Sequence, residues 1–183
     1  IKLFVNLPMV SLAKQVLYYE KKLKILNFRF NYFTSGKHSY DNIAIDLLPH
    51  AISFILSLQM KKLDNFKIYS VMCKKTRWDC KILINYCYCF FSFHQNIKRK
   101  KSILSFNLNK NFYLRQQVKL NNEYFISLIK NKKKVIKLKN PINEYLKLML
   151  NSFMNNMHIK KNNILALDIM KLTEQLINFK KIK

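Results

Sequence analysis

Apolar positions along the chain follow two different spacings, which predict where helices give way to strands. In residues 12–26 the apolar side chains recur every three or four positions, which is typical of one face of a helix. In residues 52–60 and 66–73 apolar and polar side chains alternate, which is typical of strands. We therefore expect two paired strands, with residues 61–65 as the turn between them.

Helices are expected on both sides of this ribbon. Residues 41–48 are interpreted as the last turns of a helix, because Pro49 cannot continue one. After the ribbon, Thr76 is a suitable N-cap for a helix that begins near Trp78. The apolar stripe expected on that helix comprises Trp78, Ile82, Tyr86, Phe90 and Phe93.

Two further helices are expected near the end of the sequence. Asn140 and Pro141 form an N-cap and a first-turn proline. The apolar face that follows comprises Tyr145, Met149, Phe153 and Met157, and that of the last helix comprises Leu165, Ile169, Leu172, Leu176 and Phe179. The pattern predicts a mostly α fold, a helical bundle of about six helices with one protruding two-stranded β-ribbon.

Residues 92–140 differ from the rest of the chain in composition and in the clustering of their charges. Lysines and Arg99 cluster at both ends of this stretch, around residues rich in Asn, Phe and Tyr. We expect a basic insertion at 92–140, and a helical domain made of residues 1–91 and 141–183 with the ribbon at about 52–73. A solvated, disordered loop is the alternative for the insertion.

The charge points to a polyanionic partner. The chain has 34 Lys plus Arg against 9 Asp plus Glu, a net charge of +25. Neutralising phosphates would relieve the self-repulsion of such a surface. Aromatic residues next to these cations are typical of base stacking or, more often at helical spacing, of a core.

Chemistry-bearing residues are few and scattered. The cysteines are Cys73, Cys80, Cys87 and Cys89, with no C-x-x-C pair, so we expect buried thiols and no metal site. The histidines, His38, His50, His94 and His158, have no evident Cys or Asp partner, and the acidic residues form no carboxylate pair. We therefore predict that the chain is not an enzyme and uses no cofactor.

Membrane insertion and import signals are not expected. The most apolar stretch, residues 43–60, is interrupted by Asp46, Pro49 and His50. No signal or transit peptide is evident, and Lys outnumbers Arg 30 to 4, which is typical of the AT-rich codons of many organelle and some parasite genomes. These features favour a protein made inside a mitochondrion.

The order of these elements, with several short motifs, resembles the universal small-subunit ribosomal protein seven family. The motif Ile43–Pro49 is similar to the helix that ends in proline before that family's ribbon, and Lys61-Lys62-Leu63 is similar to its ribbon turn. Further similar segments are 4–6, 9–18, 74–77, 146–148 and 168–174. The family's paired glycines at the ribbon turn are Asp64-Asn65 here, and residues 92–140 have no counterpart.

This resemblance implies a structural protein of the mitochondrial small ribosomal subunit. It would bind the 3′ major (head) domain of the small-subunit rRNA, contact neighbouring head proteins, and line the path of exit-site tRNA and mRNA. The residues expected to bind rRNA are Lys61, Lys62, Lys74, Lys75, Arg77, Lys98, Arg99, Lys100, Lys101, Lys132, Lys133 and Lys134. A basic peripheral membrane subunit of an organellar complex is the alternative function.

Overall fold

The computed structural model describes residues 7–20, 24–35, 42–95, 102–120, 123–155 and 159–179 of the 183-residue chain. Its helices are α1 (Pro8–Tyr19), α2 (Asn42–Gln59), α3 (Pro141–Asn155) and α4 (Ile159–Phe179). Its strands are β1 (Asn27–Thr34), β2 (Phe66–Lys74), β3 (Arg77–Ile84), β4 (Cys87–Gln95), β5 (Ile103–Leu108), β6 (Asn111–Leu120), β7 (Glu123–Lys130) and β8 (Lys134–Leu138).

The described strands form one mixed sheet in the order β2-β3-β4-β1-β5-β6-β7-β8. Two antiparallel meanders, β2 to β4 and β5 to β8, flank the first strand. β1 pairs parallel to β4 and antiparallel to β5. The chain therefore leaves β1, passes through α2, β2 and β3, and returns beside β1 as β4.

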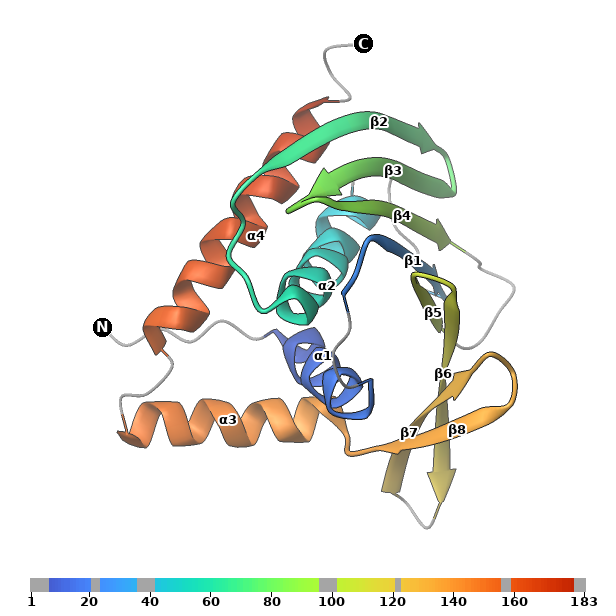
Figure 1. Ribbon diagram of the computed structural model, residues 1–183, viewed down its shortest axis with the longest axis vertical. Coiled ribbons are helices and arrows are strands. Elements are labelled where there is room, and N and C mark those ends of the chain that lie inside the picture. The colour runs from blue at the N-terminus through green and yellow to red at the C-terminus, as the bar shows by residue number, and fades with distance from the viewer. Residues whose placement is uncertain are drawn as a thin grey trace.

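The helices lie on one side of this curved sheet, as Figure 1 shows. We call the side of the sheet that they cover the inner face. Phe54 of α2 packs there, with its ring centroid 5.8 Å from that of Phe28 in β1 and 4.9 Å from that of Phe106 in β5. The apolar core therefore lies between the helices and the inner face.

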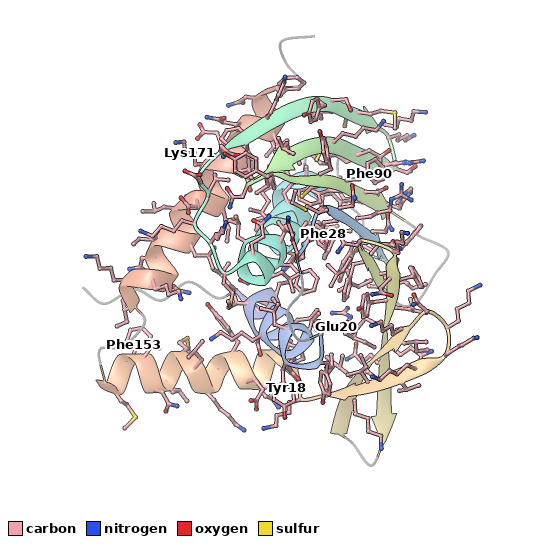
Figure 2. The ribbon with its side chains drawn as sticks, viewed as in Figure 1. Tyr18, Glu20, Phe28, Phe90, Phe153 and Lys171 are labelled. Carbon is pink, nitrogen blue, oxygen red and sulfur yellow. The ribbon has the colours of Figure 1, made fainter. Side chains whose placement is uncertain are left out.

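The opposite face of the sheet, which we call the outer face, is covered by no described helix. Successive side chains of a strand point to opposite faces. On β4, Tyr88 is 59% exposed, whereas its neighbours Cys87 and Cys89 are buried. Arg29 of β1 lies over the ring of Phe90 on this face, with the guanidinium carbon 5.1 Å from the ring centroid, and Figure 2 labels Phe90 on β4.

The predicted helical bundle is wrong. An eight-stranded mixed sheet with helices on its inner face is an α/β architecture. The predicted two-stranded ribbon at 52–73 is also wrong, because residues up to Gln59 belong to α2 and β2 pairs with β3 instead. Residues 92–140 extend from the end of β4 through β5, β6, β7 and β8, so their described parts form half of the sheet.

The segment 52–60 was expected as a strand because its apolar residues alternate, but it is the second half of α2. The side chains buried on every side of this helix, each at most 2% exposed, are Ile52, Phe54, Ile55, Leu56 and Leu58. Full burial removes the polar face that makes a helix visible in a sequence. Each such side chain contributes about 1.5–3 kcal/mol, so together they outweigh the cost of about 3 kcal/mol for Pro49 inside the helix.

The helix predicted from Trp78 to Phe93 is also wrong, because these residues form the β3–β4 hairpin. Asn85 and Tyr86 join the two strands with φ angles of 46° and 67°. Two successive positive φ values are typical of the two-residue turns whose twist matches that of paired strands. Trp78 and Phe93 come from opposite strands and stack with their ring centroids 5.7 Å apart.

Several predicted elements are confirmed. The strand at 66–73 is β2, and the helix predicted from Pro141 is α3. The last predicted helix is α4, which buries Ile169, Leu172 and Leu176 as its pattern indicates. These elements have one clear buried stripe or a regular alternation, which is the signal that a sequence shows best.

Candidate active site

A cavity of about 460 Å³ lies between the first turns of α1 and α3, the middle of α2 and the inner face of the sheet. This volume is within the roughly 300–1,000 Å³ range of small-molecule sites. The described residues that line it are Pro8, Met9, Leu12, Tyr32, His50, Arg115, Gln117, Ile126, Asn140, Pro141 and Ile142. The lining is mostly apolar, and a few polar groups converge on it.

His50 is the histidine among the described residues that line this cavity. It lies one helical turn after Asp46 on α2, so both side chains project from the same side of the helix. Burial lowers the pKa of His50, the Arg115 guanidinium lowers it further, and the Asp46 carboxylate opposes them. The imidazole is therefore neutral at physiological pH and can accept a proton.

Arg115 and Gln117 enter the cavity from β6. They alternate with Gln116 and share the side of the strand that holds buried Tyr113, which stacks on Phe106 of the inner face. Arg115 is half-buried, whereas Gln117 is exposed at the mouth of the cavity. The site therefore combines a base from a helix with a cation and an amide from a strand far along the chain.

The rim of the cavity is fixed by hydrogen bonds between α1 and the segment before α3. Gln15 donates from Nε2 to the carbonyl of Lys139 at 3.0 Å, and its Oε1 accepts the Lys139 N–H at 2.8 Å. Asn140 Oδ1 accepts the N–H of Ile142 at 3.0 Å and so caps α3. These bonds hold the rim in place while His50 and Arg115 point between its helices.

The C-terminal end of α1 is joined by an ion pair to β7, which lies beside the strand that carries Arg115. Lys130 of β7 donates to both carboxylate oxygens of Glu20, at 2.7 and 2.8 Å, and Figure 2 labels Glu20 just after α1. Both side chains are largely buried, and the Lys130 ammonium lies 5.7 Å from the centroid of the Tyr113 ring. The ion pair therefore fixes the helix that carries Met9 and Leu12 against the strands that carry Arg115 and Ile126.

A second, larger hollow of about 710 Å³ lies on the outer face. The described side chains around it are mainly amides, cations and aromatic rings, among them Asn107, Lys81 and Tyr88. Cys89 also borders it, but burial raises the pKa of this thiol well above its ordinary value. Because no histidine is among the described residues around this hollow, the His50 cavity is the better candidate for acid–base chemistry.

The cations expected to bind rRNA do not gather in one place. Lys61 and Lys62 lie in the loop between α2 and β2, while Lys74, Lys75 and Arg77 lie at the other end of β2 in the β2–β3 hairpin. Lys132, Lys133 and Lys134 form the β7–β8 turn. β2 and β8 are the opposite edges of the sheet, so these groups are separated by its whole width. Lys98, Arg99, Lys100 and Lys101 lie outside the described residues.

Cys80, Cys87 and Cys89 are buried, as predicted, and Cys73 is half-buried. Within the described ranges, no group of three or more His, Cys, Asp or Glu side chains is placed to hold a metal ion.

Comparison with solved structures shows what the fold is. A dehydrogenase from Clostridium difficile superimposes with a TM-score of 0.59 at 11% identity, over 96% of this chain and 61% of that one. UDP-N-acetylglucosamine 3-dehydrogenase from Acidithiobacillus ferrooxidans gives 0.57 at 11% identity, over 96% and 63%. A Gfo/Idh/MocA family oxidoreductase from Vibrio cholerae gives 0.54 at 12% identity, over 98% and 62%.

The chain shares their fold. It spans about three fifths of the length of each of these oxidoreductases. No family model and no curated protein matches the sequence.

This likeness overturns the ribosomal interpretation. The resemblance to ribosomal protein seven is wrong, because it required a helical bundle with a ribbon and the chain has an eight-stranded sheet shared with dehydrogenases. The expected role in translation and the expected partners (small-subunit rRNA, head proteins, tRNA and mRNA) are wrong for the same reason. The expectation that the chain is not an enzyme is overturned too, since these folds are those of oxidoreductases.

The expectations about membrane insertion and localisation are unaffected by these comparisons. Among the described helices, none is long and apolar enough to cross a membrane. The mitochondrial localisation stays a prediction.

The sequence did not reveal His50 or Arg115 as functional residues. His50 was interpreted as a surface or core histidine without an Asp partner, because residues 41–60 were divided between a helix end and a strand. On one continuous helix, Asp46 and His50 have the four-residue spacing of side-chain neighbours, and that spacing was the signal available. Arg115 gave no signal, because a distant strand brings it to the cavity.

Proposed function

We propose that this chain is the substrate-binding and proton-transferring part of an oxidoreductase that interconverts a hydroxyl and a carbonyl group. The observation that carries the proposal is that His50, which is half-buried, and the Arg115 cation line the same cavity, within electrostatic range of each other. The fold shared with three dehydrogenases or oxidoreductases supports the same reaction class.

His50 acts as the general base. As the substrate C–O bond becomes C=O, the hydroxyl proton passes to the neutral imidazole, and in the reverse direction the imidazolium returns it. Asp46 stabilises the imidazolium, since its carboxylate favours the charged form of His50. The hydrogen on the reacting carbon leaves as a hydride with both electrons of the C–H bond, and its acceptor would be an oxidised nicotinamide supplied from outside the described residues.

The described residues do not fit a dinucleotide cofactor, which is a common hydride carrier in dehydrogenation. A pyrophosphate requires a Gly-rich turn between a strand and the N-terminus of a helix. The described residues with positive φ are Met60, Asn85, Tyr86, Asn109, Asn131 and Lys132. None is glycine, and none lies between a strand and the start of a helix. We therefore assign binding and proton transfer, and no redox step, to the described residues.

Ligand binding by a His50→Asn variant tests the proposal. The Kd values of a panel of polyols, aldoses and hydroxy acids are measured by calorimetry at pH 7, where the neutral imidazole can accept the hydroxyl proton in a hydrogen bond. Loss of this acceptor should raise the Kd by about three- to tenfold, as expected for one hydrogen bond. Asn keeps a hydrogen-bonding group of similar size, so the variant should fold.

His94→Asn is the matched control for this experiment. His94 is a half-buried histidine whose pKa is also lowered by burial and by a neighbouring arginine, but it lies on β4 beside Ser92 and away from the cavity. Its loss should leave the Kd within about twofold of the wild-type value. Equal Kd values for the two variants, or no binding of any panel member by the wild-type protein, would contradict the proposal.

A further inference from the structure

Arg115 is a cation inside the cavity without a carboxylate partner in the described structure. The ion pairs between described residues join Arg77 to Asp79, Lys130 to Glu20 and Lys147 to Glu144. Arg115 belongs to none of them, although an arginine stays charged at every physiological pH. Its backbone on β6 is fixed by pairing with Leu128 of β7, so the side chain projects from the inner face of the sheet.

The surroundings of Arg115 make this unpaired charge costly. Met9, Leu12 and Ile126 provide apolar walls, and an isolated charge beside such walls loses hydration without gaining a partner. The field of the guanidinium reaches His50, because it lowers the pKa of the imidazole. The charge therefore lies within electrostatic range of the place where the reacting hydroxyl would lie.

The other polar groups of the cavity cannot neutralise it. Gln117 and Tyr32 are uncharged, and the side chain of Asn140 already accepts the Ile142 N–H. A guanidinium presents its N–H groups as a planar fork, which matches the two oxygens of a carboxylate. An anionic ligand would therefore supply the negative charge that the described residues do not place beside Arg115.

We propose that the substrate of this site is a hydroxy acid, whose carboxylate pairs with Arg115 while its hydroxyl lies at His50. The inference rests on the proposed function, because it assigns the hydroxyl to the base already named. Gln117, at the mouth of the cavity, donates its amide to a further oxygen of the ligand. The cavity volume of about 460 Å³ accommodates a small sugar acid.

Binding measurements with a matched pair of ligands test this substrate class. Gluconate and sorbitol have the same carbon number and differ chiefly in the carboxylate, and their Kd values are measured by calorimetry or ligand-observed NMR. The wild-type protein should bind gluconate about tenfold more tightly than sorbitol. In Arg115→Met, which removes the charge and keeps the side-chain length, the ratio of the two Kd values should fall to about one.

Two further variants distinguish specific binding at Arg115 from the nonspecific attraction of anions by a highly basic protein. A net charge of +25 attracts any anion, so Arg29→Met on the outer face serves as the control and should keep the wild-type ratio. Arg115→Lys keeps the charge and loses the fork, so its ratio should lie between those of the wild type and Arg115→Met.

The outcomes distinguish this inference from the proposed function. Equal affinity of the wild-type protein for gluconate and sorbitol, or an unchanged ratio in Arg115→Met, overturns the hydroxy acid assignment and leaves the role of His50 intact. Tighter binding of glucose 6-phosphate than of gluconate overturns the carboxylate in favour of a phosphate. A preserved ratio together with unchanged Kd values in His50→Asn overturns the proposed function alone.

Discussion

Asn85, in the β3–β4 turn, connects several segments through the hydrogen bonds of its side chain. It occupies a left-handed conformation with φ of 46° and is 9% exposed. Its Oδ1 accepts the backbone N–H groups of Asp64 and Asn65, and its Nδ2 donates to the carbonyl of Lys62 at 2.7 Å. One side chain therefore ties the β3–β4 turn to the loop that follows α2.

Tyr86 follows Asn85 in the same turn and provides the first prediction. Its φ of 67° is costly for a residue with a Cβ atom, and its side chain is 72% exposed. Tyr86→Gly should raise the free energy of unfolding by about 1 kcal/mol, because Asn-Gly is the preferred sequence for such turns. Urea denaturation measures the change.

Tyr88→Gly is the control for that substitution. Tyr88 is also exposed, but it lies in the extended β4 strand and stacks on Tyr69, with ring centroids 6.2 Å apart. Glycine there loses the stacking and weakens the strand, so the protein should become less stable. Stabilisation by both substitutions would show that removal of an exposed tyrosine, and not relief of the left-handed conformation, is the cause.

At the scale of the element, the β3–β4 hairpin carries a buried polar network. Asp79 of β3 is 4% exposed, lies 2.6 Å from Arg77 Nε, and accepts a hydrogen bond from Ser92 Oγ of β4. Ser92 Oγ also lies 2.8 Å from His94 Nε2. The network joins residues of adjacent strands and so fixes the register of the hairpin.

Removal of the Ser92 hydroxyl should destabilise the protein. In Ser92→Ala the buried Asp79 carboxylate loses a donor, which should cost about 1–3 kcal/mol in the free energy of unfolding. Ser57→Ala on α2 is the matched control, since the Ser57 hydroxyl is buried without a partner among the described residues and its removal should be neutral or stabilising. Denaturant midpoints of both variants are compared with the wild type; an unchanged Ser92→Ala midpoint would show that the network contributes nothing.

How far the sequence predicts an element depends on how that element is buried. α4 and β2 each have a clear pattern of exposed and buried positions, and both were predicted. α2 is buried all round in its second half, so its helical period is hidden and Pro49 was taken as its end. In β3 and β4, apolar residues at helical spacing and a turn of Asn85 and Tyr86, without glycine, concealed a hairpin.

The candidate site was hidden from the sequence for a related reason. The wrong assignment of α2 separated Asp46 from His50, although both were noted as polar interruptions of an apolar stretch. Arg115 reaches the cavity only because β6 joins the sheet beside β5, which pairs with β1. Such a pairing between distant segments is not contained in any local pattern of residues.

At the scale of the whole molecule, the two described histidines make stability depend on pH. The pKa values of His50 and His94 are both lowered from 6.5 by burial and by nearby arginines. Below about pH 6.5 the unfolded chain therefore binds protons that the folded chain does not. The free energy of unfolding should fall as the pH decreases from 6.5 toward the folded-state pKa values, and stay level above 6.5.

Urea denaturation across this range tests the dependence. Measurements stay above about pH 5, where carboxylates with ordinary pKa values remain ionised. A variant with both His50→Asn and His94→Asn should show a smaller loss of stability between pH 6.5 and 5 than the wild type. The same loss in both proteins would mean that other groups cause it.

The central position of β1 has a consequence for biosynthesis. β1 is made first among the strands, but its partners β4 and β5 are made only after α2, β2 and β3. Until then both of its edges lack hydrogen-bond partners, in a segment that contains Phe28, Phe30, Tyr32 and Phe33. Open apolar edges pair readily with other chains and cause aggregation. Arg29, between Phe28 and Phe30, places a charge where a nascent chain is most exposed to such pairing.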